Sequence, residues 1–423
     1  MPASNNVFSQ SFSGNYPLVL AKKMMFETIK NMFWGKWARF TTPGGAYVQK
    51  GNVPKPVSSP IAIQNELSGR AGDLIEIPMH RNLKNFWRLG KEQMKEHEEE
   101  PKVNFIQVPV ELLRHAEKPQ ESTIDTQVNK DLRLIQNAKP ALQRHYSQGM
   151  NYWMCSWAMY NGYSLNVLAS DRWSGHSKVA AAQHPHIFCA GRGKVSYSTY
   201  GYPGNAAYNQ GVATEMGFIG AGDVFDTGFL NGLKADPAIQ KIAPIIMKDG
   251  NEFRLIIAHG WQIKDLEADA TFREITAAAQ AQTYAKDNPY LVGCKYIWAG
   301  FAIFESDTAV FPVRVASSVP QWGPSTVQVA AVTGDITSHE DYTSDTMFGA
   351  IVLGANALFL ANADRLEYKK RVDDYDELVG IAYRHIAGAA RADFWNRDDG
   401  TTGQHIVNES SALCITYGAA PGF

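Results

Sequence analysis

Three side chains in one short segment have the chemistry to bind a metal ion. His184, His186 and Cys189 offer the imidazole and thiolate groups that zinc takes as ligands. A structural zinc site needs four such ligands, however, and no second cluster in the sequence completes the set. We therefore expect no metal and favour a turn at His-Pro-His. An enzyme with a metal site in residues 164–222 remains an alternative.

Two glycine-rich segments could bind a nucleotide. Gly217, Gly220 and Gly222 follow a short apolar run and precede an expected helix, as in a dinucleotide-binding fingerprint. The third position of that fingerprint would be Phe225, which is too large for the close packing that glycine allows. Residues 191–194, Gly-Arg-Gly-Lys, lack the spacing and the hydroxyl of a phosphate loop. We expect no cofactor.

No set of residues predicts a catalytic site. The sequence has no Gly-x-Ser-x-Gly turn, and no nucleophile, base and orienting group can be named together. The acidic run at residues 373–377 is expected to be a solvated face or a contact between subunits. We therefore expect that the protein is not an enzyme.

The charge balance argues against a protein that grips nucleic acid. Lys and Arg number 40 against 42 Asp and Glu, a net charge of −2, whereas binding through phosphates usually requires a basic excess. The four widely spaced cysteines predict reduced, mostly buried thiols. No signal peptide and no apolar run of about 18 residues occurs, so no membrane contact is expected.

The first 60 residues are expected to form an arm rather than a domain. Residues 22–39 have apolar side chains at helical spacing, and a proline-rich stretch follows. A helix with an exposed apolar face is poorly stable alone. We expect Met25, Phe33 and Trp37 to contact either the chain's own body or a neighbouring copy.

Residues 61–115 are expected to form a long hairpin. Residues 74–79 and 103–110 have the composition of strands, and the polar residues 81–102 connect them. A connection this long is usually functional or disordered, and aromatic residues at its middle disfavour disorder. We expect it to lie on another copy of the chain, through Phe86, Trp87, Arg88, Lys91, Glu98, Glu99 and Glu100.

One long helix is predicted over residues 124–160. Apolar residues recur there in steps of three and four, and roughly 35 helical residues would span about 50 Å. Pro140 is expected to kink the helix or to split it. The helix belongs to a region, residues 116–222, that ends in an irregular insertion rich in Gly, Tyr, Ser and Asn. The side chains expected in the core are Leu132, Ile135, Trp153 and Trp157.

The rest of the chain mixes helices and strands. In residues 223–345 we expect a helix that Asp223 caps and Asp236 ends, a hairpin that turns at residues 248–251, two further helices and a strand pair. Residues 346–423 are predicted to add mainly strands. Because helices and strands do not alternate regularly, the fold class is α+β and not a doubly wound sheet.

This order of elements resembles a tailed-phage major capsid protein of the Hong Kong 97 type, within the family of the coliphage N-four capsid protein. Five local patterns carry the resemblance over roughly residues 20–417. The family usually has proline after the histidine of the second pattern, where this chain has Gly260. The patterns are residues 70–78 (RAGDLIEIP), 249–259 (DGNEFRLIIAH), 288–293 (NPYLVG) with 298–300 (WAG), 353–357 (LGANA) and 374–376 (DYD).

The resemblance implies a Hong Kong 97-type capsid fold. Its parts would be an N-arm (1–60), an E-loop (61–115), a P-domain with a spine helix (116–222), an A-domain (223–345) and a C-terminal return to the P-domain (346–423). Copies would assemble as hexamers and pentamers into the icosahedral shell of the virion around packaged dsDNA. Assembly in the host cytoplasm would involve a scaffolding protein, a portal protein at one vertex and, in some relatives, a decoration protein. An encapsulin-like shell is an alternative.

Overall fold

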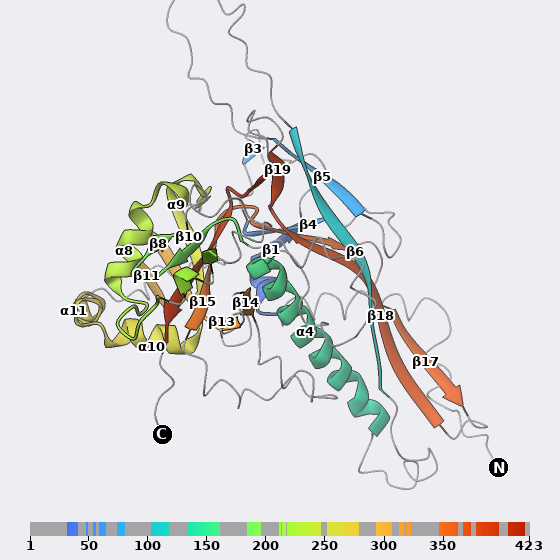
Figure 1. The fold of residues 1–423 in the computed structure, drawn as a ribbon. Helices are drawn as coiled ribbons and strands as arrows, with labels where there is room; N and C mark the ends of the chain where they lie inside the picture. Colours follow the sequence, from blue (N-terminus) through green and yellow to red (C-terminus); the bar gives the residue numbers. More distant parts are fainter. Residues whose placement is uncertain are drawn as a thin grey trace, which may run out of the picture.

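The computed structural model shows an α+β protein with two β-sheets and one long helix (Figure 1). The long helix lies against the first sheet, on the right of Figure 1, and short helices cover the second sheet on the left. The structure describes residues 32–40, 48–49, 54–55, 59–64, 74–80, 103–117, 134–160, 184–195, 211–212, 214–216, 218–246, 252–278, 293–306, 313–316, 319–322, 347–362, 367–373, 378–396 and 405–418.

The first sheet has seven strands in the order β1-β4-β16-β18-β6-β5, with β17 also paired to β18. β18 is central, because β6 pairs along one side of it while β17 and β16 share the other side. The strands are β1 (Ala38–Phe40), β4 (Ile61–Gln64), β5 (Leu74–His80), β6 (Val103–Glu117), β16 (Leu358–Asn362), β17 (Glu367–Asp373) and β18 (Leu378–Arg391).

The second sheet has eight strands in the order β11-β12-β10-β15-β21-β7-β8, with β9 paired to β10. Alternate side chains enter two different cores: Leu255 and Ile257 pack toward the long helix, and Ile256 packs under the short helices. Both faces are thus buried, which explains the nearly continuous apolar runs. The strands are β7 (Ile187–Cys189), β8 (Gly193–Lys194), β9 (Ile245–Ile246), β10 (Glu252–Ala258), β11 (Tyr296–Trp298), β12 (Phe301–Glu305), β15 (Met347–Leu353) and β21 (Ser411–Tyr417).

The described part of the chain contains the long helix α4, several short α-helices and a 3-10 turn, and residues 211–212 and 214–216 are helical as well. The named elements among them are η1 (Trp34–Trp37), α4 (Leu134–Tyr160), α8 (Thr227–Ala235), α9 (Pro237–Lys241), α10 (Gly260–Ala268) and α11 (Ala270–Ala278). Three two-stranded ladders complete the described elements: β2 (Val48–Gln49) with β3 (Pro54–Lys55), β13 (Val313–Ala316) with β14 (Val319–Trp322), and β19 (Phe394–Asn396) with β20 (His405–Val407).

The expected cap of α8 is wrong by three residues. Asp226, not Asp223, occupies the N-cap and accepts a hydrogen bond from the Phe229 N–H at 2.7 Å. The backbone of Asp223 instead pairs with the end of β21, which holds it outside the helix. Asp236 ends α8 as expected, and its carboxylate also caps α9 by accepting the Ala238 N–H.

Several local expectations are confirmed. β9 and β10 form the expected antiparallel pair, and their connection at residues 247–251 lies outside the described residues. β11 and β12 form the expected strand pair, and their turn residues Ala299 and Gly300 both have positive φ angles (51° and 88°). That conformation fits a tight hairpin turn. Residues 346–423 contribute strands to both sheets.

The four residues between β15 and β16 carry the chain from the second sheet to the first. Gly354 donates its N–H to the Ser410 carbonyl at 2.7 Å, and Asn356, with φ 54°, donates to the Ser59 carbonyl at 2.7 Å. A Cβ at Gly354 would collide with the carbonyl oxygen of Ala243. Glycine therefore permits the close backbone approach that this crossing needs.

We predict opposite effects for two Gly→Ala substitutions. Gly354→Ala should lower the free energy of unfolding by about 1–3 kcal/mol, because backbone atoms must move to admit the methyl group. Gly232→Ala in α8 meets nothing within 4 Å and should raise it by about 0.5–1 kcal/mol through helix propensity. Chemical denaturation of both variants checks this. A Gly354→Ala variant as stable as the unsubstituted protein would contradict the tight crossing.

Candidate assembly elements and a buried polar junction

The expected hairpin is present as a paired stem. β5 and β6 are antiparallel over seven residue pairs, from Leu74 opposite Pro109 to His80 opposite Val103. Figure 1 shows this stem projecting from the upper end of the first sheet. The seven contact residues expected in the connection lie outside the described residues: Phe86, Trp87, Arg88, Lys91, Glu98, Glu99 and Glu100. The structure thus describes the base of the hairpin, and its tip stays a prediction.

The N-terminal aromatic residues pack against the chain's own body. Trp37 is fully buried and lies edge-on to Phe304 of β12, with 4.9 Å between ring centroids. Phe33 donates its N–H to the Asn151 side chain on α4 at 3.0 Å. Trp34 donates its indole N–H to the Asn151 carbonyl at 3.1 Å. These residues join α4 to the second sheet, while Met25 lies outside the described residues.

The α-helix expected over residues 22–39 is wrong for its last part. Residues 34–37 form a 3-10 turn and residues 38–40 form β1, which pairs in parallel with β4. Because side chains three residues apart lie on the same side of a 3-10 turn, Trp34 and Trp37 both enter the core, and strand pairing then satisfies the backbone. Tertiary burial has overridden the helical spacing.

The long helix α4 covers the first sheet, chiefly β18 and β6. Trp153 and Trp157 are buried as expected, each 3% exposed. α4 continues through Pro140, so the expected split does not occur. Because proline has no backbone N–H, one intrahelical hydrogen bond is missing at this position. Leu132 lies outside the described residues, and nothing is described of the Ile135 side chain.

The three side chains considered as metal ligands are engaged in the protein interior. His186 donates its backbone N–H to His184 Nδ1 at 3.0 Å, so His184 Nε2 carries the proton and donates to Ser411 Oγ at 3.1 Å. Burial holds the pKa of His184 well below its usual range and lowers the pKa of His186 to about 4. Burial raises the pKa of Cys189 to about 12, so its thiol stays protonated. Among the described residues, no group of three or more His, Cys, Asp or Glu could hold a metal.

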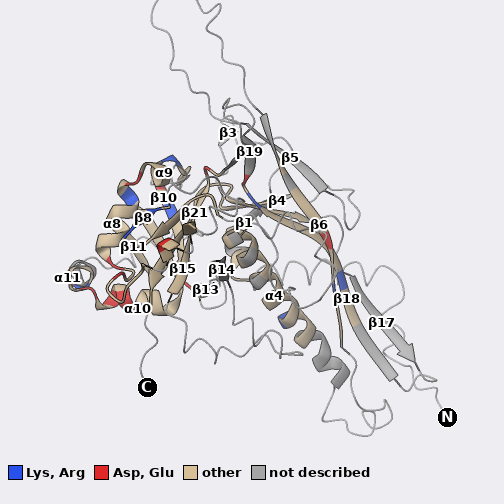
Figure 2. Cartoon of the chain, in the orientation of Figure 1, with Lys and Arg blue, Asp and Glu red and all other residues tan. Residues whose placement is uncertain are grey.

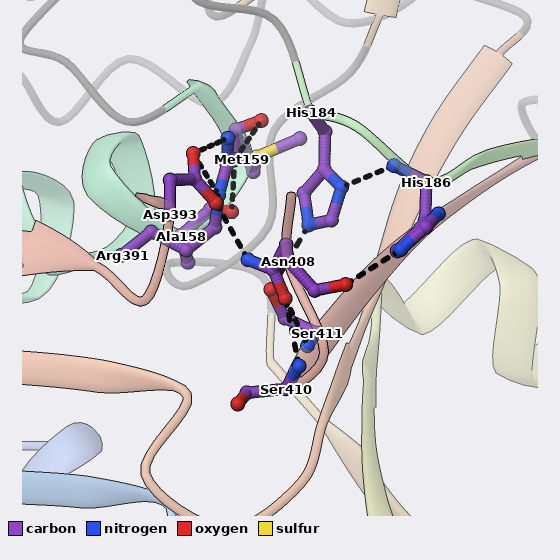
Figure 3. Close-up of polar contacts among 9 residues, drawn as sticks. All are labelled: Ala158, Met159, His184, His186, Arg391, Asp393, Asn408, Ser410 and Ser411. Carbon is purple, nitrogen blue, oxygen red and sulfur yellow. Dashed lines mark hydrogen bonds and ion pairs between the residues drawn. The ribbon is translucent and has the colours of Figure 1, made fainter. Parts of the chain in front are cut away.

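Arg391 lies where α4 and the two sheets meet (Figure 3). Its guanidinium is fully buried, and Nη1 donates to the carbonyls of Ala158 and Met159 at 3.1 and 3.2 Å. Nε and Nη2 donate to the Asp393 carboxylate at 2.9 and 2.5 Å. Carbonyls in the last turn of a helix lack intrahelical partners. Arg391 therefore caps α4 and fixes its end to β18.

Asn408 extends this contact to the second sheet. Its Nδ2 donates to Asp393 at 2.6 Å, and its Oδ1 accepts the N–H groups of Ser410 and Ser411 at 2.8 Å each, where β21 begins. The Asn408 carbonyl accepts from His186 Nε2 at 2.6 Å, just before β7. We call His184, His186, Arg391, Asp393, Asn408 and Ser411 the buried polar junction. We did not predict this junction from the sequence. The one sequence feature that could have indicated it is the charged pair Arg391 and Asp393 at the end of an apolar strand.

A second polar cluster fixes α4 to the first sheet. The His145 ring stacks on His115 of β6, with centroids 4.0 Å apart, and its Nδ1 lies 3.2 Å from the Tyr383 hydroxyl on β18. Tyr146 and His385 share a hydrogen bond of 2.6 Å. Burial, and then the neighbouring His115, lower the pKa of His145. The aromatic stripe of α4 therefore contacts polar rings as well as apolar core.

Of the glycines weighed as a nucleotide motif, Gly220 and Gly222 lie in a loop ahead of α8, and Gly217 lies outside the described residues. Amides at the start of α8 are satisfied by the chain's own carboxylates, since Asp226 accepts from Phe229 and Asp269 accepts from Thr227. Phe225 is fully buried. The helix N-terminus is thus already occupied, and nothing in this geometry favours a phosphate.

We predict that breaking the buried ion pair is costly. Arg391→Met should lower the free energy of unfolding by about 3–5 kcal/mol, because Asp393 would be left as a buried, unpaired charge. Arg391→Met combined with Asp393→Asn should lose less, since no charge is stranded. Denaturant unfolding of both variants measures the difference. If the single and the double variant lost the same free energy of unfolding, no interaction between Arg391 and Asp393 would be detected.

We also predict a dependence of stability on acid through His186. Its pKa is about 4 when folded against a model value of 6.5, so only the unfolded chain gains the proton between these values. The free energy of unfolding should fall with decreasing pH there, by at most about 1.4 kcal/mol per pH unit. His186→Gln, whose amide can still donate to Asn408, should flatten the slope. The comparison with His186→Gln is needed because burial also raises the pKa of Glu111 to about 7. Protonation of that carboxyl in the folded state raises the free energy of unfolding as the pH falls, opposite to the effect of His186. Parallel pH curves for the two proteins would refute this assignment.

Solved structures of phage heads share this architecture. The capsid of Ralstonia phage GP4 aligns over 90% of this chain and 92% of that chain, with a TM-score of 0.59 and 15% identity. The cyanophage Pam1 capsid aligns over 86% and 90%, with a TM-score of 0.53 and 17% identity. The head of Helicobacter pylori bacteriophage KHP40 aligns over 89% and 95%, with a TM-score of 0.51 and 9% identity. At these identities the similarity establishes the fold.

The sequence itself matches a family model described as phage capsid protein over residues 55–419. No curated protein matches the chain. In the part of the chain that the structure describes, no helix has the length and apolarity to cross a membrane. The α+β fold of the Hong Kong 97 type is confirmed by the solved structures. Because the family model spans most of the sequence, the chain belongs to the phage capsid protein family.

Proposed function

We propose that this capsid protein is the major subunit of an icosahedral phage head and that its described elements divide the work of assembly. The family match over residues 55–419 carries the structural role in the virion. In our assignment, the first sheet with α4 is the P-domain and the second sheet with α8 to α11 is the A-domain. The hairpin of β5 and β6 is the E-loop. The encapsulin-like and enzymatic alternatives gain no support from the family match.

The E-loop is proposed to lie on a neighbouring copy. Its stem is held by seven residue pairs, so its base is fixed to the first sheet. The connection of residues 81–102 combines aromatic residues with a run of charges. Such a segment gains apolar area by covering another surface. By contrast, Phe33 and Trp37, also expected to make contacts, pack inside their own subunit and are proposed to brace it.

The remaining partners follow from the shell role as proposals. Copies would form hexamers and pentamers, with a scaffolding protein during assembly in the host cytoplasm and a portal protein at one vertex. A decoration protein could use the outer surface. The near-zero charge balance suits a wall around packaged dsDNA, because a strongly basic lining would hold the genome and resist its movement.

We predict that the E-loop tip is needed for shells and dispensable for folding. His80 and Val103 face each other at the end of the stem, so replacing residues 81–102 with Asn-Gly should close a tight hairpin. The variant should be a soluble, folded monomer with unchanged circular dichroism and no shells by electron microscopy. A control that replaces the tip with a Gly/Ser linker of equal length should also fail to assemble. Normal particles from either variant would contradict the E-loop assignment.

A further inference from the structure

The two ends of the second sheet present different surfaces. Near the start of β10, Arg254 donates to the carbonyls of Ile242 and Gln240 around α9, at 3.0 and 3.1 Å. The last residue of β10 leads through His259 into α10. A strand of this length spans about 20 Å. The α9 end and the α10 end of the sheet therefore lie on opposite sides, as Figure 1 shows.

The α10 end carries an exposed aromatic residue. Phe218 is 58% exposed, and the Arg192 guanidinium lies over its ring at 4.5 Å and pairs with Glu215 at 3.1 Å. The loop of Phe218 is held at this end because Asp223 pairs with Tyr417, the last residue of β21. An aromatic and an arginine together are typical of the centre of a protein interface.

Carboxylates surround that aromatic end. They outnumber the neighbouring bases Arg192, Lys264, Arg273 and Lys295, although Lys295 already pairs with Glu267 and Glu305. Figure 2 shows red segments at α10 and α11. The carboxylates of this end are Asp223, Asp265, Glu267, Asp269, Glu274 and Glu305.

The α9 end offers the opposite chemistry. Lys234 and Lys241 are exposed, and neither has an ion pair within the described residues. Pro237 and Ala243 are exposed beside them and add a small apolar surface. Figure 2 shows blue segments at the end of α8, at α9 and on β10. The acids Asp236, Glu252 and Glu409 also lie at this end, so its basic character rests on the exposed Lys234 and Lys241. This end could receive both an aromatic side chain and a carboxylate rim.

We propose that neighbouring copies within a ring contact each other head to tail, with the α10 end of one copy on the α9 end of the next. The inference rests on the proposed assembly into hexamers and pentamers. A contact between two different surfaces of the same chain closes into a ring when the rotation between successive copies completes a circle, and each copy then uses both surfaces once. Phe218 packs against Pro237 and Ala243. The opposite charges set the register and oppose pairing of two like ends.

A charge-exchange experiment tests this contact. Lys241→Glu and Glu274→Lys should each raise the protein concentration needed for assembly about tenfold, because one pair of unlike charges becomes a pair of like charges. An equimolar mixture of the two variants can alternate around a ring with every contact attractive. The mixture should therefore restore hexamers near the original concentration, measured by sedimentation velocity and electron microscopy. It should fail to close pentamers, because an odd ring cannot alternate.

Phe218→Ser provides an independent test that involves no charge. The side chain is mostly exposed, so circular dichroism and the unfolding midpoint should stay unchanged while assembly weakens. Single variants that all assemble like the unsubstituted protein, or a mixture no better than its components, would overturn the head-to-tail contact. The head-to-tail contact would also be overturned if the variants assembled normally by themselves and lost only their binding to a scaffolding protein. If the unsubstituted chain itself formed neither rings nor shells, the proposed function would fail instead.

Discussion

The rest of this structure depends most on the contacts that the buried guanidinium of Arg391 makes. It satisfies the carbonyls at the end of α4 and pairs with Asp393. Asn408 then joins that pair to the start of β21 in the second sheet. The chain crosses between the sheets beside this point, where Ala392 donates its N–H to the Ala357 carbonyl, so an uncompensated charge here would weaken the contacts among all three parts. A buried pair need not add net stability, but losing one partner strands the other.

The sequence allowed the local elements to be predicted with fair accuracy. Apolar runs beside the expected turn at residues 248–251 located β10, and residues 346–423, which were expected to add mainly strands, contain β15 and β21. The expected strand pair is β11 with β12. Which sheet each strand joins could not be read from such runs, because strands buried on both faces show no alternation. The same limit applies near residue 34, where helical spacing of aromatic residues concealed a 3-10 turn.

The buried polar junction escaped prediction for a different reason. His186, Arg391 and Asn408 come from separate segments, and each alone has an ordinary meaning in sequence. Their roles arise only when the fold places them together. The histidines illustrate this, since their residue types led us to weigh a metal site and reject it, but did not reveal their role as buried, neutral hydrogen-bonding groups. The misplaced cap of α8 has a similar cause, because Asp223 and Asp226 are both of a residue type that caps helices and the sequence does not distinguish them.

A shell subunit of this kind combines a rigid body with extended contacts. Two cores on the faces of the second sheet, and α4 against the first, make the body rigid. Contacts between copies should each be modest, so that misplaced subunits can leave during assembly. The E-loop and the two ends of the second sheet fit that need, and their charges should make assembly sensitive to salt.

Negative-stain electron microscopy tests the central claim most directly. The full chain would be imaged after expression alone and after expression with a candidate scaffolding protein. Polyhedral shells, partial shells or capsomer-sized rings in either sample are the result that our account predicts. A monodisperse monomer under both conditions would contradict it.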